Sequence, residues 1–214
     1  MPGRPALRRS AAGAIVAILA ALVLAADQFV KYLTTENLPL QEPVPVLGEF
    51  LQLYYVRNPG AAFSLGSDVT WIFTIALAVV ACVIVWKASG LRSWLWAVVL
   101  GCLLGGVLGN LTDRLFRDPG FPMGHVVDMI SMPWMMPAIF NVADIFIVTG
   151  MISVALLVVF GLRFDGTRDR DHAPVETDEE AEAAAVIADA EAAADTDPSR
   201  LDGTTPGTPA SDGR

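Results

Sequence analysis

The sequence has few of the residues on which most nucleophilic and metal sites depend. It contains two cysteines and two histidines among 214 residues. Cys82 and Cys102 lie inside apolar runs, and we interpret both as small hydrophobic residues rather than disulfide partners or metal ligands. His172 lies in a polar C-terminal segment and His125 stands alone, so neither is placed for a catalytic triad. Since a phosphate-binding glycine loop is also absent, we predict no metal, no cofactor and no nucleic-acid partner.

The negative charge of the chain is concentrated at its C-terminal end. The net charge is −9, but residues 165–214 alone hold 14 acidic and 4 basic residues. This segment has almost no large apolar side chains with which to bury surface, and it is predicted to be a disordered cytoplasmic tail. The acidity of the chain therefore carries no information about the partners of the remaining residues.

Four long uncharged runs dominate the rest of the chain, and the mean hydropathy of +0.52 is too high for an ordinary soluble domain. Each run can cross a hydrocarbon core of about 30 Å as a helix. Helices are expected because backbone polar groups in lipid must pair internally. The sequence therefore predicts an all-α integral membrane protein, with a small extracytoplasmic β element. The four transmembrane helices are expected over about residues 11–33, 69–87, 93–112 and 138–162.

Basic residues near the ends of these runs predict how the chain crosses the membrane. They gather before the first run, between the second and third, and after the fourth. Lys and Arg accumulate on the cytoplasmic side, so both termini are predicted to be cytoplasmic and the two long loops to face outward. The predicted domains are a cytoplasmic N-terminal tail at 1–9, a four-span membrane domain at 10–164 and the tail at 165–214.

The first run also has the pattern of a cleavable signal peptide, because basic residues precede an apolar stretch ending in Leu24-Ala25-Ala26. Cleavage there would leave three spans. Asp27 and Lys31 continue the helical pattern beyond that position, and we therefore favour a retained helix.

Polar residues gather at the outer ends of the predicted spans. Charge is costly in lipid, so each such residue is a candidate for function. Asp27 and Lys31 share one helical face, which fits either a structural ion pair or a part in shaping a site. The spacing N-x-x-D occurs twice, at the end of the third span and at the start of the fourth. The predicted topology brings to one surface Asp27, Lys31, Asn58, Asn110, Asp113, Arg114, Asp128, Asn141 and Asp144.

Two further patterns bear on the packing around these residues. Residues 49–56 are rich in Tyr, Phe and Leu and predict a short strand or hairpin at the membrane surface. Gly101, Gly105 and Gly109 recur at a spacing of four, which is typical of close packing between membrane helices. Such packing would bring the neighbouring helix near Asp113.

Clustered carboxylates at a partly dehydrated surface favour one kind of chemistry. Two carboxylates held within about 3 Å cannot both ionise easily, so they share a proton. The ionised member can take a proton from water while the protonated member donates to a substrate carbonyl. This predicts peptide hydrolysis of the aspartic type. Spacing alone does not decide whether Asp113 or Asp128 is the partner of Asp144.

Five motifs, in this order over roughly residues 20 to 150, resemble the lipoprotein signal peptidases, also called signal peptidase II. They are D-Q-F-V-K at 27–31, N-P-G-A-A-F-S at 58–64, G-N-L-T-D-R at 109–114, V-V-D at 126–128 and F-N-V-A-D at 140–144.

The resemblance implies an aspartic endopeptidase of the bacterial cell membrane with Asp128 and Asp144 as its catalytic pair. It implies that the substrates are diacylglyceryl-modified prolipoproteins, cleaved just before the lipidated cysteine, with the acyl chains lying between spans in contact with membrane lipid. We expect a monomer. The residues expected to support the pair or bind substrate are Asp27, Lys31, Asn58, Asn110, Asp113, Arg114 and Asn141.

The chain departs from the family pattern in two places. The segment from Arg117 to His125 lengthens the connection between Asp113 and Asp128, and Ile145 follows the second aspartate where a small polar residue is common. Neither removes a required group, although both are placed to alter substrate access or carboxylate pKa.

Two other classes of function use part of the same residue pattern. A small transporter would use Asp27, Lys31 and Asp144 as an ion relay, but it calls for charges near the membrane midplane and broken helices. A non-catalytic scaffold would use the same residues as a structural network. It predicts that aspartate variants lose stability rather than turnover.

Overall fold

The computed structural model describes residues 7–60, 69–168 and 186–187. The chain divides into two units, Met1–Asp171 and His172–Arg214. Most of the predicted acidic tail, most of the predicted N-terminal tail and residues 61–64 of the second motif lie outside the described residues. The long helices and the strands of the described residues all belong to the first unit.

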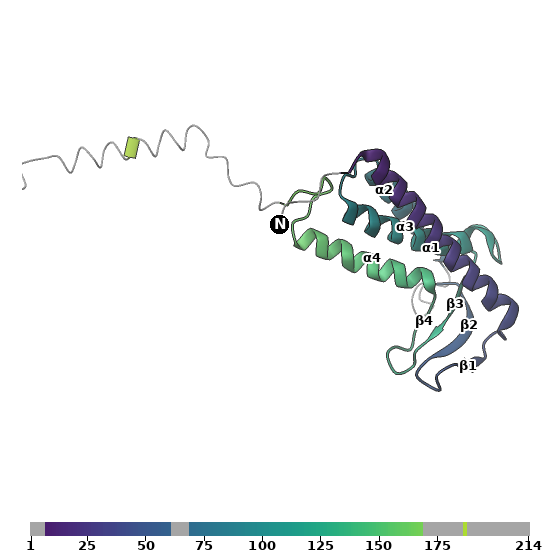
Figure 1. The fold of residues 1–214 in the computed structure, drawn as a ribbon. Coiled ribbons are helices and arrows are strands. Elements are labelled where there is room, and N and C mark those ends of the chain that lie inside the picture. The colour runs from purple at the N-terminus through teal and green to yellow at the C-terminus, as the bar shows by residue number, and fades with distance from the viewer. Residues whose placement is uncertain (1–6, 61–68, 169–185, 188–214) are drawn as a thin grey trace, which may run out of the picture. The chain divides into compact units, whose positions relative to one another are not determined.

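Four helices form the membrane-spanning part of this unit (Figure 1). They are α1 (Arg9–Asn37), α2 (Thr70–Ala88), α3 (Trp94–Phe116) and α4 (Val142–Val159). Each is long and apolar enough to cross a membrane. The prediction of four membrane-spanning helices is therefore confirmed, and the chain is a multi-pass membrane protein.

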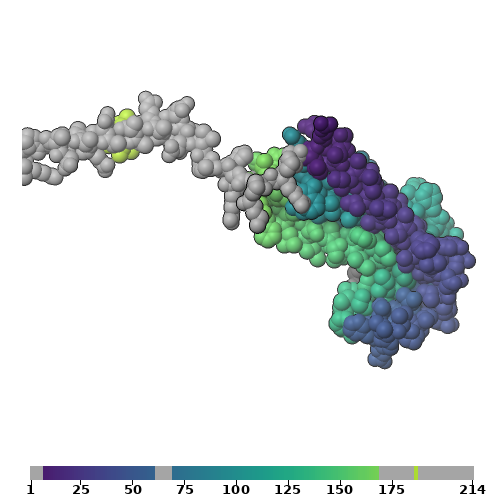
Figure 2. Space-filling model, in the orientation of Figure 1, coloured from purple at the N-terminus to yellow at the C-terminus, as the bar shows by residue number. Residues whose placement is uncertain are grey.

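Helix α3 is the centre of the bundle and contacts each of the other three helices. In its most apolar stretch 67% of the residues are buried, against at most 22% in the other three helices. The outer helices leave large apolar side chains such as Leu22 and Val85 exposed. Figure 2 shows α1 and α4 on the visible surface of the bundle. Such surfaces are stable because lipid, rather than water, surrounds them.

The glycine face of α3 packs against α1 as the spacing predicted. A Cβ atom at Gly105 would lie 2.8 Å from the carbonyl oxygen of Ala20, and one at Gly101 would also meet α1 backbone. At Gly109 a Cβ would lie 2.5 Å from Oδ2 of Asp27. The glycines therefore let the two helices approach closely and leave space for a carboxylate between them.

A four-stranded antiparallel sheet, in the order β1-β2-β3-β4, lies at one end of the bundle (Figure 1). Its strands are β1 (Pro43–Pro45), β2 (Gln52–Asn58), β3 (Val126–Ser131) and β4 (Ile139–Phe140). The prediction of an all-α protein was therefore incomplete, because the fold is mostly helical but contains this sheet. The short strand or hairpin predicted over residues 49–56 corresponds to β2 alone. Strand β1 precedes that range, and β3 and β4 come from the loop between α3 and α4.

The register between β2 and β3 sorts their side chains onto two faces. Asn58 pairs with Val126, and Arg57 pairs with Val127. Successive side chains of a strand point to opposite faces. Asn58, Val126 and Asp128 therefore share one face of the sheet, while Arg57 and Val127 occupy the other.

Helix α4 begins later than its apolar run suggested. The sequence predicted a start near Ala138, but the helix starts at Val142. Residues 139–140 instead pair with β3. Asn141 then forms a capping box, in which its side chain accepts from the backbone N–H of Asp144 at 3.0 Å. The cap ends the strand and begins the helix because it satisfies backbone donors that lack partners within the first turn.

Candidate active site

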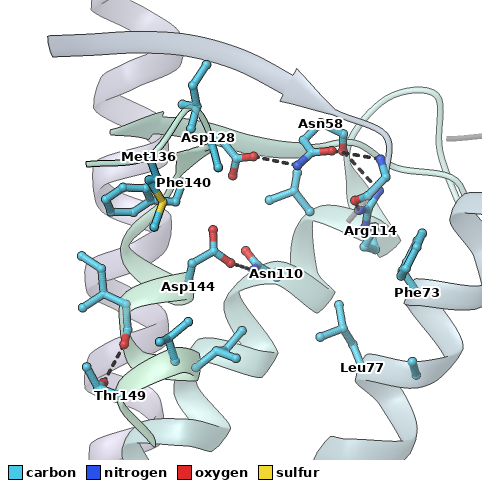
Figure 3. A pocket seen from close by; sticks show the side chains of 18 of the residues that line it. Asn58, Phe73, Leu77, Asn110, Arg114, Asp128, Met136, Phe140, Asp144 and Thr149 are labelled. Atoms are coloured by element: carbon cyan, nitrogen blue, oxygen red, sulfur yellow. Dashed lines mark hydrogen bonds between the residues drawn. The ribbon is translucent and has the colours of Figure 1, made fainter. Parts of the chain in front are cut away.

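Asp128 and Asp144 line one cavity at the sheet end of the bundle, which we call the carboxylate cavity. Asp128 projects from the middle of β3 and is 2% exposed. Asp144 lies in the first turn of α4 and is half-buried. Figure 3 shows the two carboxyl groups extending into the space between β3 and α4. The fold thus brings together two acids that are 16 residues apart in the sequence.

Three asparagine side chains hold these two carboxylates. Asp128 accepts from Nδ2 of Asn58 at 2.9 Å and from Nδ2 of Asn141 at 2.6 Å. Asp144 accepts from Nδ2 of Asn110 at 2.7 Å and from the backbone N–H of Asn141 at 3.1 Å. All four carboxylate oxygens therefore receive a hydrogen bond from an uncharged donor, which fixes the orientation of both acids.

The amides are themselves linked to one another. Nδ2 of Asn141 also donates to Oδ1 of Asn110 at 3.1 Å. The same Oδ1 accepts from Nζ of Lys31 at 2.9 Å. Since Asn110 binds Asp144 and Asn141 binds Asp128, this pair of amides connects the lysine to both carboxylates.

Lys31 lies at the centre of a fully buried charge cluster. Its ammonium group contacts Oδ2 of Asp27 at 2.9 Å and Oδ2 of Asp113 at 2.8 Å, and all three side chains are 0% exposed. With the bond to Asn110, the three N–H groups of the lysine have three acceptors. Burial of such charges is tolerated only when they are paired and hydrogen-bonded in this way.

The two aspartates of this cluster also bind backbone around the cavity. Oδ1 of Asp27 accepts from the backbone N–H of Ala143 at 2.9 Å, in the first turn of α4. Oδ2 of Asp113 accepts from the backbone N–H of Val127 at 3.1 Å, next to Asp128 in β3. The ion cluster therefore holds the two backbone segments that carry the candidate catalytic acids.

Gln28 belongs to the same cluster and was missed as a candidate in the sequence. Its Nε2 lies 3.1 Å from Oδ1 of Asp113, 3.1 Å from the carbonyl oxygen of Gly109 and 3.2 Å from Oδ2 of Asp27. The signal for it in the sequence was its position in the first motif, between Asp27 and Lys31.

Arg114 serves the loop after β2 rather than a carboxylate. It is 3% exposed, and its guanidinium donates to the carbonyl oxygens of Pro59 at 2.8 Å and Gly124 at 3.1 Å. It also donates to the carbonyl oxygens of Asn58 and Gly60. By binding the backbone of residues 58–60 and of Gly124, Arg114 positions Asn58 against Asp128.

The surroundings of Asp128 favour its protonated form. Burial, and then the negative charge of Asp144, raise the pKa of Asp128 from 3.8 to about 7. Hydrogen bonds from Asn58 and Asn141 oppose this shift without cancelling it. Near neutral pH the site can therefore hold one proton on a carboxyl group that would be ionised in water.

Apart from the two acids, Asn58, Asn110, Arg114 and Thr149, the lining of the carboxylate cavity is apolar. The cavity has a volume of about 670 Å³. Phe73 and Leu77 of α2 form one wall (Figure 3), while Ile145 and Val148 of α4 contribute to the opposite side. Ile145, one of the two departures from the family pattern, therefore faces the space beside Asp144. The arrangement combines two carboxyl groups with a hydrophobic chamber between helices.

The chain matches the sequence model of the family described as Signal peptidase (SPase) II over residues 19–160. The chain belongs to the signal peptidase II family. This match covers all four helices for most of their length and every residue of the site described above. It confirms the family that the five motifs predicted, and with it the prediction of a membrane-bound peptidase of prolipoprotein processing.

Individual members of the signal peptidase II family agree with this assignment. The chain is 48% identical over 169 residues to the lipoprotein signal peptidase of Leifsonia xyli subsp. xyli, covering 78% of each protein. It is 46% identical over 151 residues to that of Rhodococcus jostii, covering 71% of this chain and 75% of the relative. It is 43% identical over 155 residues to that of Mycobacterium tuberculosis, covering 72% and 75%.

Solved structures support the same fold. Two structures of a bacterial membrane enzyme, determined by the in meso method at 2.3 and 1.9 Å, match with TM-scores of 0.60 and 0.59 at 26% identity. Each covers 67% of this chain, and 87% and 92% of the solved chain respectively. The assignment of roles to single residues in this signal peptidase II family member remains a prediction.

Proposed function

We propose that this member of the signal peptidase II family is an aspartic endopeptidase acting on diacylglyceryl-modified prolipoproteins. It cleaves the signal peptide just before the lipidated cysteine, with Asp128 and Asp144 as the catalytic pair. The observation that carries the proposal is the joint position of these two acids in one cavity, whose walls are mainly apolar side chains. Neither acid forms an ion pair with a described residue, so both are available to exchange protons.

The proton balance of the proposed reaction depends on the raised pKa of Asp128. Asp128 holds the proton of the pair, and Asp144 is ionised. Asp144 takes a proton from water as the water oxygen attacks the scissile carbonyl, while Asp128 gives its proton to the carbonyl oxygen. When the C–N bond breaks, Asp144 returns its proton to the leaving nitrogen. Asp128 recovers a proton from a hydroxyl of the intermediate, so both acids return to their starting protonation states.

The other residues of the site hold the two acids in a fixed orientation. Asn58 and Asn141 orient Asp128, and Asn110 orients Asp144. Arg114 holds the loop on which Asn58 lies. Asp27, Lys31 and Asp113 act as positioning residues through the backbone of α4 and β3. Because peptide cleavage requires the water and both acids to be aligned, this rigidity contributes to turnover.

The apolar walls suit the lipid part of such a substrate. Side chains of α2 and α4 form a hydrophobic chamber directly beside the carboxylates. Acyl chains attached to the cysteine would occupy this chamber in contact with membrane lipid, which brings the peptide bond before that cysteine to the acids.

The proposed placement in the bacterial cell membrane has the sheet and the carboxylate cavity on the extracytoplasmic side. The distribution of basic residues supports it, because they cluster at the opposite ends of the spans. We propose that α1 is retained in the mature protein, since Asp27 and Lys31 belong to the buried cluster. We further propose a cytoplasmic position for both termini and a monomeric enzyme.

The test is cleavage of a synthetic diacylglyceryl precursor by purified full-length protein. Asp128→Asn and Asp144→Asn should each reduce kcat at least about 10³-fold, as expected when one member of an acid–base pair is removed. Asp118→Asn is the matched control, because Asp118 lies at the same end of the bundle but outside the carboxylate cavity. Near-normal turnover in either active-site variant would refute the assignment. Loss of thermal stability with unchanged turnover would favour a scaffold instead.

A further inference from the structure

A second cavity lies at the same end of the bundle, on the opposite face of the sheet. It has a volume of about 240 Å³, and we call it the arginine cavity. It has no lining residue in common with the carboxylate cavity, because β2 and β3 direct alternate side chains to the two sides. Its polar lining residues are Thr35, Tyr55, Arg57, Arg117, Asp118 and His125.

Both arginines of this cavity have N–H donors that remain available to a ligand. Nε of Arg117 donates to Oδ1 of Asp113 at 2.7 Å, and its two terminal amino groups have no hydrogen-bond partner among the described residues. Nε of Arg57 donates to the hydroxyl oxygen of Tyr55 at 3.0 Å. The terminal groups of Arg57 have only a loose contact, 3.7 Å to a carboxylate oxygen of Asp118, whose side chain is 89% exposed.

The arginine cavity is therefore rich in donors and poor in acceptors. Two guanidinium groups, the Tyr55 hydroxyl and the His125 imidazole face one solvent-exposed carboxylate. A ligand that complements this lining supplies several acceptor oxygens and negative charge. Guanidinium groups bind phosphate and carboxylate oxygens with paired hydrogen bonds. A phosphate group, which offers oxygens in several directions, can engage two arginines that approach from different strands and helices.

The position of the cavity indicates where such a phosphate would come from. Thr35 lies in the last turn of α1, and Phe116 and Arg117 lie at the end of α3, where both helices leave the membrane. Phe116, which lines the cavity, is 80% exposed, and Phe121, in the loop that follows α3, is 75% exposed. Exposed phenylalanine side chains near a helix end suit the boundary between the headgroups and acyl chains of a bilayer. Phospholipid phosphates are the abundant anions at that depth.

We propose that the arginine cavity binds the phosphate group of an anionic phospholipid headgroup, at a site separate from the one that holds Asp128 and Asp144. The acyl chains of the lipid lie along the ends of α1 and α3, away from the chamber between α2 and α4. The site is independent of the catalytic roles proposed above, so its failure would leave those roles untouched, and the reverse also holds.

His125 provides a direct reporter for this site. Burial, and then the positive charges of Arg114 and Arg57, lower the pKa of His125. A phosphate bound between the arginines neutralises part of that charge and raises this pKa. The sequence contains only one other histidine, His172, so two imidazole signals can be followed by NMR. His172 then measures the general effect of membrane surface charge.

The experiment compares full-length protein in nanodiscs of phosphatidylcholine with nanodiscs of an equimolar mixture of phosphatidylglycerol and phosphatidylcholine. We expect the pKa of His125 to rise more than that of His172 in the anionic nanodiscs. Arg57→Gln should abolish the excess rise. For each variant, the rise is the pKa of a histidine in the anionic nanodiscs minus its pKa in the phosphatidylcholine nanodiscs. Arg92→Gln is the matched control, because it removes the same charge at an exposed position outside the cavity.

A second arm distinguishes lipid from free phosphate. Detergent-solubilised protein is titrated with inorganic phosphate and with short-chain phosphatidylglycerol, and the response of His125 is followed. We expect the lipid to bind, and Arg57→Gln to bind it about tenfold more weakly. Arg57→Lys keeps the charge and should retain most of the response, which guards against a folding defect in the Gln variant.

Three results would overturn the proposal. Equal pKa shifts of His125 and His172 in anionic nanodiscs would mean that surface charge alone is responsible. A response to inorganic phosphate without any response to phosphatidylglycerol would exclude a lipid headgroup. An excess rise that persists in Arg57→Gln would place the bound anion elsewhere.

Discussion

The side-chain amide of Asn141 donates to Oδ1 of Asp128 at 2.6 Å. The backbone N–H of the same residue donates to Oδ2 of Asp144 at 3.1 Å. One uncharged residue at the start of α4 thus contacts both candidate catalytic acids. Its side chain also caps α4, so the geometry of the pair and the start of the helix both depend on this one residue.

Replacing Asn141 tests this double role. Asn141→Ala removes a hydrogen bond to a carboxylate, worth about 1.5–3 kcal/mol, and a helix cap, worth about 1 kcal/mol. We expect kcat for a lipidated precursor to fall about 10- to 100-fold, with a smaller loss of thermal stability. Asn37→Ala is the control, since Asn37 is exposed at the end of α1 and binds only the backbone of its own helix. Equal kcat values for Asn141→Ala and wild type would argue against a positioning role.

The raised pKa of Asp128 predicts the alkaline limb of the pH–rate profile. The proposed reaction needs a proton on Asp128, and that proton is lost as the pH rises through about 7. The value of kcat/KM should therefore fall about tenfold for each pH unit well above 7. Steady-state assays with a lipidated precursor in a fixed detergent measure this directly. Activity that stays constant far above pH 7 would show that Asp128 does not act in its protonated form.

The buried Lys31 should be essential for stability. Lys31→Met leaves Asp27 and Asp113 without their shared cation, and breaking a buried pair in this way costs about 3–5 kcal/mol. We expect a marked fall in Tm in a thermal melt. Lys87→Met, at an exposed position near the other end of the bundle, should change Tm little.

Adding Asp27→Asn to the Lys31→Met variant removes the carboxylate that is left without a cation, because Asp113 still pairs with Arg117, and should restore part of the Tm. The double-mutant comparison isolates the interaction between the two residues. If Lys31→Met melts like the wild type, the cluster is not a stabilising element.

Close packing at Gly109 predicts a specific intolerance to a methyl group. A Cβ in Gly109→Ala would lie 2.5 Å from Oδ2 of Asp27, so α1 and α3 must separate or the carboxylate must move. The expected cost is about 1–3 kcal/mol, as for overpacked cores. Gly13→Ala is the control, because no atom lies within 4 Å of its added Cβ. A melt in which both variants match the wild type would contradict this close packing.

The sequence by itself determined the membrane-spanning helices and the set of polar residues at one end. Long apolar runs have one stable form in lipid, because the backbone must satisfy its own hydrogen bonds. Polar residues at the ends of such runs are brought to a common depth by the membrane. The glycine spacing on α3 likewise predicted close contact with a neighbouring helix, because absence of a side chain is a local property.

Only the tertiary structure decided which of these residues touch. The pairing of β2 with β3 joins segments about 70 residues apart, as in Arg57 opposite Val127, and no local pattern specifies that register. The start of α4 depended on the Asn141 cap rather than on apolar length. The separation of the carboxylate cavity from the arginine cavity arose from the alternation of side chains across that one strand pair. Contacts of this kind come from long-range packing, so they became visible only when the folded chain placed both strands side by side.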